Sequence, residues 1–217
     1  MKKVFLCLLL FFPGIMFGQI GIKAGLNYAK VSKAADINSS SKSGFHAGLF
    51  LAPASNKVLS SRTEILFSRQ GYNYKNSTTS GGVDLDYIQM GQLMSINITK
   101  YLSLMFGAQT AYLISANVDS SKSGTSVGSA SENSILELYN RVDFGYALGV
   151  EVHPVAGLIV GVRYNVSLAK VYKDVQSFQR PPFSSKDAKN NLVQLSVGWR
   201  FGTKSMKKDK SKLGSGE

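Results

Sequence analysis

The chain has 217 residues, a formal net charge of +12 and a mean hydropathy of −0.01. Its length suits a single domain. Cys7 is the only cysteine, which excludes an intramolecular disulfide and a thiolate metal site.

Residues 1–18 are typical of a secretory signal peptide. Lys2 and Lys3 give a basic start, Val4–Phe12 is an apolar run, and Gly18 is a small residue at the expected cleavage point. A membrane-anchoring helix is the alternative, but it needs about 18 or more apolar residues, which this run lacks. We therefore expect the chain to be exported.

Export changes what the basic charge implies. Nucleic acid is a common partner of basic proteins, but an exported protein meets anionic lipid head groups and lipopolysaccharide instead. We therefore expect no nucleic-acid partner. Simple solvation of loops is the alternative role for the excess lysines.

Eight segments alternate apolar with small or polar residues, the pattern of a β-strand with two unlike faces. The clearest is Val142–Val152, whose apolar face is unbroken over about ten residues, the length of a tilted transmembrane strand. In chain order the predicted strands are Ile20–Tyr28, Gly44–Leu51, Ser60–Tyr72, Leu85–Ile98, Leu102–Ile114, Val142–Val152, Leu158–Val166 and Asn191–Phe201.

The connections between these strands alternate between long and short. The long ones are predicted to be solvated loops, at Ser32–Ser43, Asn73–Gly82, Ser115–Asn133 and Val171–Lys189. An even number of strands with long and short connections in turn is typical of outer-membrane barrels. Closure is required because an open strand edge in hydrocarbon leaves backbone groups without hydrogen bonds.

We therefore predict an all-β fold for residues 19–201: an eight-stranded antiparallel up-and-down transmembrane β-barrel in the cell outer membrane. Outer-membrane lipid, lipopolysaccharide and the outer-membrane assembly machinery are the expected partners, and the barrel is expected to be a monomer. The alternative is a soluble lipocalin-like barrel whose apolar faces line a ligand cavity. Long loops on one side, absent disulfides and charges on the non-apolar faces argue against it.

Aromatic residues near the strand ends are expected to form the interfacial girdles of the barrel. Scattered core aromatics are the alternative. The candidates are Tyr28, Tyr72, Tyr87, Tyr101, Tyr112, Tyr164, Trp199 and Phe201.

The inward faces carry charges, and an eight-stranded barrel has room for little besides side chains. Buried charges need partners, so we predict a structural polar network that fills the lumen. Its charged and titratable members are Lys23, His46, Glu64, Asp143, Glu151, Arg163 and Arg200. The alternative is a narrow polar conduit, if the network leaves a continuous gap.

No catalytic residue, cofactor site or metal site is predicted. The two histidines, His46 and His153, are far apart in the sequence. A lipid-acting enzyme is an alternative in which His46 would join Glu64 and a serine, but no serine is marked by its context.

Several stretches resemble the PorT-like outer-membrane β-barrel family of Gram-negative bacteria. They are Gly21–Tyr28, Glu64–Gly71, Asp143–Gly149, Arg163–Asn165 with Ser167-Leu168, and the closing run to Phe201. The resemblance implies an eight-stranded outer-membrane barrel, and some PorT-type relatives serve a secretion apparatus. The chain departs from the family at Gly91, where a proline is usual.

Residues 202–217 are lysine-rich and predicted to form a disordered periplasmic tail. Binding of this tail to peptidoglycan or anionic lipid is the alternative to simple solvation. Taken together, the sequence predicts a non-enzymatic outer-membrane barrel that presents four loops as a structural or adhesive platform. A small-solute channel, a PorT-like secretion role and a lipid-acting enzyme are the other candidates.

Overall fold

The structure is a computed structural model, and it describes residues 18–32, 38–53, 58–75, 79–122, 125–127, 136, 138–173 and 187–202. The predicted signal peptide and the basic tail lie outside the described residues, apart from Gly18 and Gly202. These two predictions therefore stay predictions.

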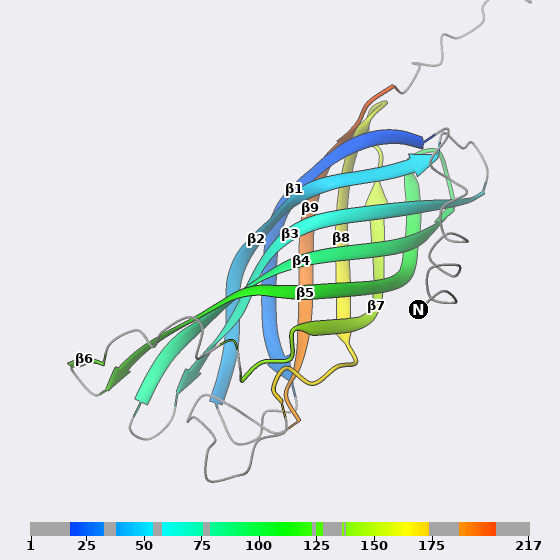
Figure 1. Cartoon of the computed structure of the whole chain (residues 1–217). Helices are drawn as coiled ribbons and strands as arrows, with labels where there is room; N and C mark the ends of the chain where they lie inside the picture. Colours follow the sequence, from blue (N-terminus) through cyan, green and yellow to red (C-terminus); the bar gives the residue numbers. More distant parts are fainter. Residues whose placement is uncertain are drawn as a thin grey trace, which may run out of the picture.

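All named elements of the described chain are strands, joined in one antiparallel sheet (Figure 1). In chain order they are β1 (Gly18–Ser32), β2 (Asn38–Pro53), β3 (Leu59–Lys75), β4 (Thr79–Asn97), β5 (Leu102–Lys122), β6 (Thr125–Val127), β7 (Val142–Val152), β8 (Leu158–Ser167) and β9 (Lys189–Arg200). Among the described residues, no helix is long and apolar enough to cross a membrane.

Eight of these strands close into a ring. Each pairs with its neighbours in chain order, β5 pairs with β7, and β1 pairs with β9 to close the circle. The short strand β6 pairs only with the end of β5. The predicted eight-stranded antiparallel up-and-down barrel is confirmed.

The alternation of side chains along each strand decides which residues face outward and which face the lumen. On β7, buried and exposed residues alternate, and Leu148 and Val150 on the outer face are 62% and 42% exposed. The opposite parity carries Ala147 and Glu151, which are buried. Apolar side chains therefore form the outer belt, and the lumen takes the polar and small ones.

The strands differ in length, and this shapes the molecule. Strands β2 to β5 have 16, 17, 19 and 21 residues, whereas β7, β8 and β9 have 11, 10 and 12. The ends of β3, β4 and β5 continue past the ring as a twisted sheet (Figure 1). We call this end, with connections 33–37, 76–78, 123–141 and 168–188, the loop end, and the opposite end the turn end.

All four predicted loops are therefore partly wrong. Residues 32, 38–43, 73–75, 79–82, 115–122, 125–127 and 189 were expected to be solvated loop, but they lie in strands. Their serine- and glycine-rich sequences lack the apolar alternation of a lipid-facing strand because they lie beyond the belt. Backbone pairing with neighbouring strands, rather than side-chain pattern, extends them.

Two register shifts mark the level at which the sheet leaves the ring. One lies between Ser41 and His46 in the β2–β3 pairing, and one between Asp86 and Tyr87 in the β4–β5 pairing. Such bulges bend a strand and re-aim its side chains. Within the first shifted segment, Lys42 reaches across β3 to Asp84 on β4, with 2.7 Å between Nζ and Oδ1.

Candidate functional site

Five charged side chains meet inside the barrel, from four strands. They are Lys23 of β1, Arg62 and Glu64 of β3, Glu151 of β7 and Arg163 of β8, and each is 5% exposed or less. Arg62 binds Glu151 through two hydrogen bonds of 2.7 and 2.8 Å, and Arg163 donates to Glu64 at 2.7 Å. Lys23 lies 3.2 Å from Glu64 and 4.0 Å from Glu151. We call these five residues the ionic cluster.

Glycines make room for the ionic cluster. A Cβ atom on Gly161 would lie 2.8 Å from Cγ of Glu151, the residue directly opposite on β7. A Cβ atom on Gly21 would lie 2.1 Å from the ring of Phe50, the residue directly opposite on β2. The guanidinium of Arg62 stacks over that ring at 4.8 Å. The lumen is thus filled by long side chains that pass over glycine.

An amide layer continues the network toward the loop end. His46 Nδ1 lies 2.8 Å from Asn27 Oδ1, and its Nε2 lies 3.2 Å from Ser196 Oγ. Gln194 donates to Asn27 at 3.1 Å and accepts from Arg163 at 2.8 Å. His46 is therefore joined to the ionic cluster through neutral amides.

Four of the predicted lumen residues meet in the ionic cluster: Lys23, Glu64, Glu151 and Arg163. His46 is joined to them as described above. Asp143 lies apart at the loop end of β7, where it accepts a hydrogen bond from Ser167. Arg200 lies at the turn end of β9, and none of the ion pairs in the described chain includes it. Both were expected to share the salt bridges. Asp143 is too far along β7 from the ionic cluster, and Arg62 rather than Arg200 binds Glu151.

Arg62 is the member of the ionic cluster that sequence reasoning missed. It precedes Glu64 by two residues, so strand parity places both on the same face. The alternation of that strand assigns residues to its two faces only from Thr63 onward, so Arg62 is left out. The correction matters because Arg62 supplies the two hydrogen bonds to Glu151.

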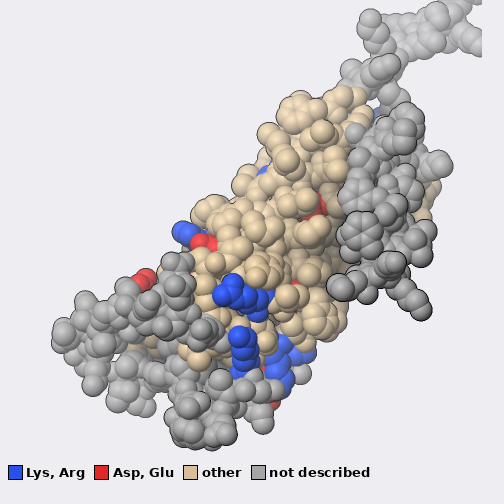
Figure 2. Space-filling model, in the orientation of Figure 1, with Lys and Arg blue, Asp and Glu red and all other residues tan. Residues whose placement is uncertain are grey.

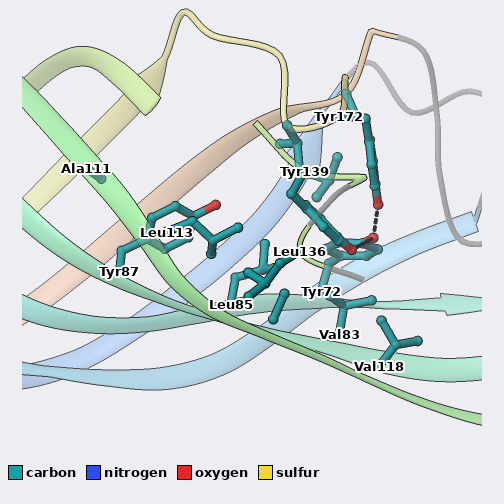
Figure 3. Close-up of a cluster of buried hydrophobic side chains, with 14 of the residues drawn as sticks. Tyr72, Val83, Leu85, Tyr87, Ala111, Leu113, Val118, Leu136, Tyr139 and Tyr172 are labelled. Atoms are coloured by element: carbon teal, nitrogen blue, oxygen red, sulfur yellow. Dashed lines mark hydrogen bonds between the residues drawn. The ribbon is translucent and has the colours of Figure 1, made fainter. Parts of the chain in front are cut away.

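The loop end holds a second interior, of a different kind. Its buried residues form one apolar cluster, which we call the loop-end core: Val31, Tyr72, Tyr74, Val83, Leu85, Tyr87, Ala111, Leu113, Ala116, Val118, Leu136, Tyr139, Val171, Tyr172 and Ala188. The rings of Tyr72, Tyr139 and Tyr172 converge, and the hydroxyls of Tyr72 and Tyr172 are hydrogen-bonded (Figure 3). The Tyr72 and Tyr139 hydroxyls lie 3.4 Å apart.

Two residues expected in the aromatic girdles belong to this core instead. Tyr72 and Tyr87 are 0% and 2% exposed, so their assignment to the girdles was wrong. Tyr72 shares the inward parity of Glu64 on β3, and Tyr87 that of Gln89 on β4. The remaining candidates are exposed on the outer face: Tyr28, Tyr101, Tyr112, Tyr164, Trp199 and Phe201.

Backbone hydrogen bonds tie two of the loop-end connections together. Asn140 donates its N–H to Val171 O at 2.9 Å, and Lys173 donates to Leu138 O at 3.0 Å. Val171 in turn donates to Ala188 O at 2.8 Å. These segments carry Tyr139 and Tyr172 into the loop-end core. The described parts of the connections are therefore folded against the sheet.

Burial raises the pKa of Tyr139 to about 12, and it raises that of Tyr172 well above the ordinary value of 10.0. Both phenols are neutral at physiological pH. A charged phenolate has no place in this core.

An arrangement in the described part of the lumen resembles a catalytic triad. Ser196, His46 and Asn27 form a chain of hydroxyl, imidazole and amide oxygen, as a serine nucleophile, base and orienting group do. All three are 6% exposed or less, so no substrate reaches the serine in this structure. In the described part of the chain, no group of three or more His, Cys, Asp and Glu is placed to hold a metal ion.

Comparison with protein families gives one match. The family model described as outer membrane protein beta-barrel domain matches residues 17–173. A comparison with curated proteins found no match.

Solved structures of small outer-membrane proteins are similar to this chain. Neisserial surface protein A is 19% identical, with 84% of this chain and 97% of that chain covered and a TM-score of 0.50. Ail, the attachment invasion locus protein of Yersinia pestis, is 19% identical over 86% and 100% of the two chains, with a TM-score of 0.47. OprG of Pseudomonas aeruginosa is 10% identical over 85% and 96%, with a TM-score of 0.43. At such identities, the likeness to the neisserial protein shows the fold alone.

Proposed function

The chain belongs to the family of outer membrane protein beta-barrel domains, and from this premise we propose that it is a closed, non-enzymatic platform. The protein lies in the outer membrane. In the proposed arrangement the turn end faces the periplasm and the loop end faces outward, as in barrels with short periplasmic turns. The loop end is then the surface that contacts partners, with a structural or adhesive role.

The loop-end core is the observation that carries this proposal. Tyr139 and Tyr172 are buried with apolar residues of β3, β4 and β5, and their segments share backbone hydrogen bonds. Loops that only connect strands need no buried core of their own. A rigid surface that meets a partner does, because a preorganised surface loses less conformational entropy on binding.

The filled lumen favours a closed barrel rather than a channel. The ionic cluster occupies the middle of the barrel, and the loop-end core fills the space beyond it. Phe50, Ala52 and Ile159 form a further apolar cluster near the turn end. A small-solute channel, the alternative, would need all three layers to open.

Lipid and lipopolysaccharide are the proposed surroundings of this platform. Figure 2 shows a wide surface without charges, and lysines and arginines gathered toward the loop end. Lys30, Arg141 and Lys173 are exposed there. Cations at this level suit the phosphates of lipopolysaccharide. Insertion by the outer-membrane assembly machinery is part of the same proposal.

Hydrogen exchange tests the platform. The amides of Asn140, Val171 and Lys173 donate hydrogen bonds within the loop end, so we expect them to exchange far more slowly than that of Lys100 in a turn. Exchange at the rate of an unstructured peptide would contradict a folded loop end. The protein would be labelled in lipid nanodiscs, without its signal peptide.

A hydrolase that acts on lipid is a second candidate, because of the Ser196–His46–Asn27 chain. Its test is labelling by a fluorophosphonate, which reacts with activated serines. The platform predicts no labelling, since Ser196 is 6% exposed. Labelling that is lost in Ser196→Ala and in His46→Ala would establish the enzyme and overturn the platform.

The resemblance to PorT-type barrels suggests a third role, in which the protein is associated with a secretion apparatus. The same closed platform would then hold other secretion components. Copurification of the intact protein from its native membrane with such components is the test.

A further inference from the structure

Polar side chains on the lipid-facing surface are confined to one side of the barrel. On β1, β2, β7, β8 and β9, every described outward position within the apolar belt is apolar. Four outward positions on the other three strands are polar and uncharged: Ser61, Thr63, Gln92 and Thr110. We call these four residues the polar patch.

The members of the polar patch are neighbours. Gln92 of β4 lies directly opposite Thr63 of β3 and Ala108 of β5. Ser61 and Thr110 are the next outward residues along β3 and β5. The patch therefore runs diagonally across three adjacent strands, with Gln92 at its centre.

Gln92 lies near the middle of the bilayer. Asp86 of β4 pairs with Arg69 of β3, whose side chain is 44% exposed on the outward side. The strand turns at Ile98, and both Asp86 and Ile98 are six residues from Gln92. At about 3.3 Å per residue and a tilt of roughly 45°, six residues span about 14 Å of membrane thickness. Water is absent at that depth.

The carboxamide of Gln92 is only half satisfied. Thr63 Oγ1 donates to its Oε1 at 2.6 Å. The described residues offer its two amide hydrogens no acceptor. Lipid tails offer none either, so an amide donor points into hydrocarbon.

We propose that the polar patch is the surface through which two copies of this chain pair in the outer membrane. A carboxamide is complementary to itself, since Gln92 can donate to the partner's Gln92 while accepting from it. Two-fold symmetry provides this reciprocal contact, and a small residue at Ala108 lets the two surfaces approach. The monomer expected from the sequence alone leaves both amide hydrogens unpaired.

Disulfide trapping tests the pairing. The only cysteine of the chain is Cys7, within the predicted signal peptide, so Ala108→Cys adds a single thiol to the mature protein. Ala24→Cys on β1 is the matched control, because Ala24 is also an exposed, outward alanine in the belt. Both variants would be oxidised in native outer membranes and analysed on a non-reducing gel.

We expect a disulfide-linked dimer for Ala108→Cys and none for Ala24→Cys. Adding Gln92→Leu should lower the dimer fraction by roughly threefold to tenfold, as for a lost hydrogen bond in lipid. The mobility of unboiled samples would verify that each variant is folded.

Three results would overturn the proposal. They are no dimer from Ala108→Cys, equal dimer from both thiols, or a dimer that Gln92→Leu leaves unchanged. A cross-link to a different protein would show that this protein binds the polar patch, and the proposal of a second copy would be wrong.

Discussion

The barrel is filled in two different ways along its axis. Toward the turn end and the middle, charged residues from four strands form the ionic cluster, each bound to opposite charges. At the loop end, apolar side chains and tyrosine hydroxyls form a core like that of a soluble protein. Removal of one charge leaves its partners buried without an opposite charge, whereas removal of one apolar group leaves only a cavity. The two regions should therefore respond very differently to substitution.

The largest effect is expected for Glu64→Ala. Lys23, Arg62 and Arg163 all contact this carboxylate, and its loss leaves three cations with Glu151 alone. Breaking a buried ion pair costs about 3–5 kcal/mol. Urea unfolding in detergent, followed by the mobility of unboiled samples, would measure it. Ile65→Ala, the next residue on the lipid-facing side, is the control, and equal losses for both would contradict the ionic cluster.

Leu113→Ala tests the loop-end core. Leu113 is fully buried there, and such a truncation costs about 2–4 kcal/mol. We expect the loss to be local: the amides of Asn140 and Val171 should exchange faster while the ring stays closed. Equal acceleration in β8 and β9 would show that the two regions unfold as one.

Gly161→Ala tests the packing around Glu151. The added methyl would lie 2.8 Å from Glu151 Cγ, and overpacking of this kind costs about 1–3 kcal/mol. Gly91→Ala is the control, since its methyl would lie 3.9 Å from the nearest atom. The free energy of unfolding should fall in the first variant and stay unchanged in the second.

Alkaline pH should separate the two regions without mutation. The pKa of Tyr139 is about 12 in the folded protein against 10.0 for an ordinary tyrosine. A raised folded pKa means that this stabilisation is complete below pH 10 and is lost as the pH rises through 12. Exposed tyrosines ionise near pH 10, so Tyr139 is read from the difference in phenolate absorbance between the wild type and Tyr139→Phe. This difference should appear only as the pH approaches 12, and a difference already complete near pH 10 would contradict burial.

The smallest effect is expected outside both regions. Lys42 and Asp84 form an ion pair on the outer face of the loop end, with side chains 23% and 29% exposed. Pairs of this kind are worth about 0–1 kcal/mol. Lys42→Ala should leave the unfolding midpoint nearly unchanged. A loss comparable to that of Glu64→Ala would show that this exposed pair stabilises the fold as much as the buried ionic cluster.

The ring was predictable from the sequence because hydrocarbon imposes a strict rule on both faces of each strand. Alternation from Val142 to Val152 appears in the structure with the same bounds. The same parity marks Lys23, Glu64, Glu151 and Arg163 as inward. Where the parity was not followed to the strand end, as for Arg62 and Tyr72, the residue was missed or misplaced.

The loop end was not predictable in the same way. Beyond the belt, water satisfies exposed backbone groups, so a strand there needs no lipid-facing apolar pattern. Ser120 and Ser121 pair with β4 although their sequence reads as a loop. The contact of Tyr72 with Tyr172 joins residues 100 positions apart, and no local pattern signals it.

Electrical recording from planar lipid bilayers would show whether the lumen is closed. The protein without residues 1–18, the predicted signal peptide, would be inserted from detergent, with a known porin as the positive control. A closed barrel, filled by the ionic cluster and the loop-end core, predicts a silent membrane under applied voltage. Steady single-channel conductance from the unmodified protein would contradict a closed barrel and establish the small-solute channel in its place.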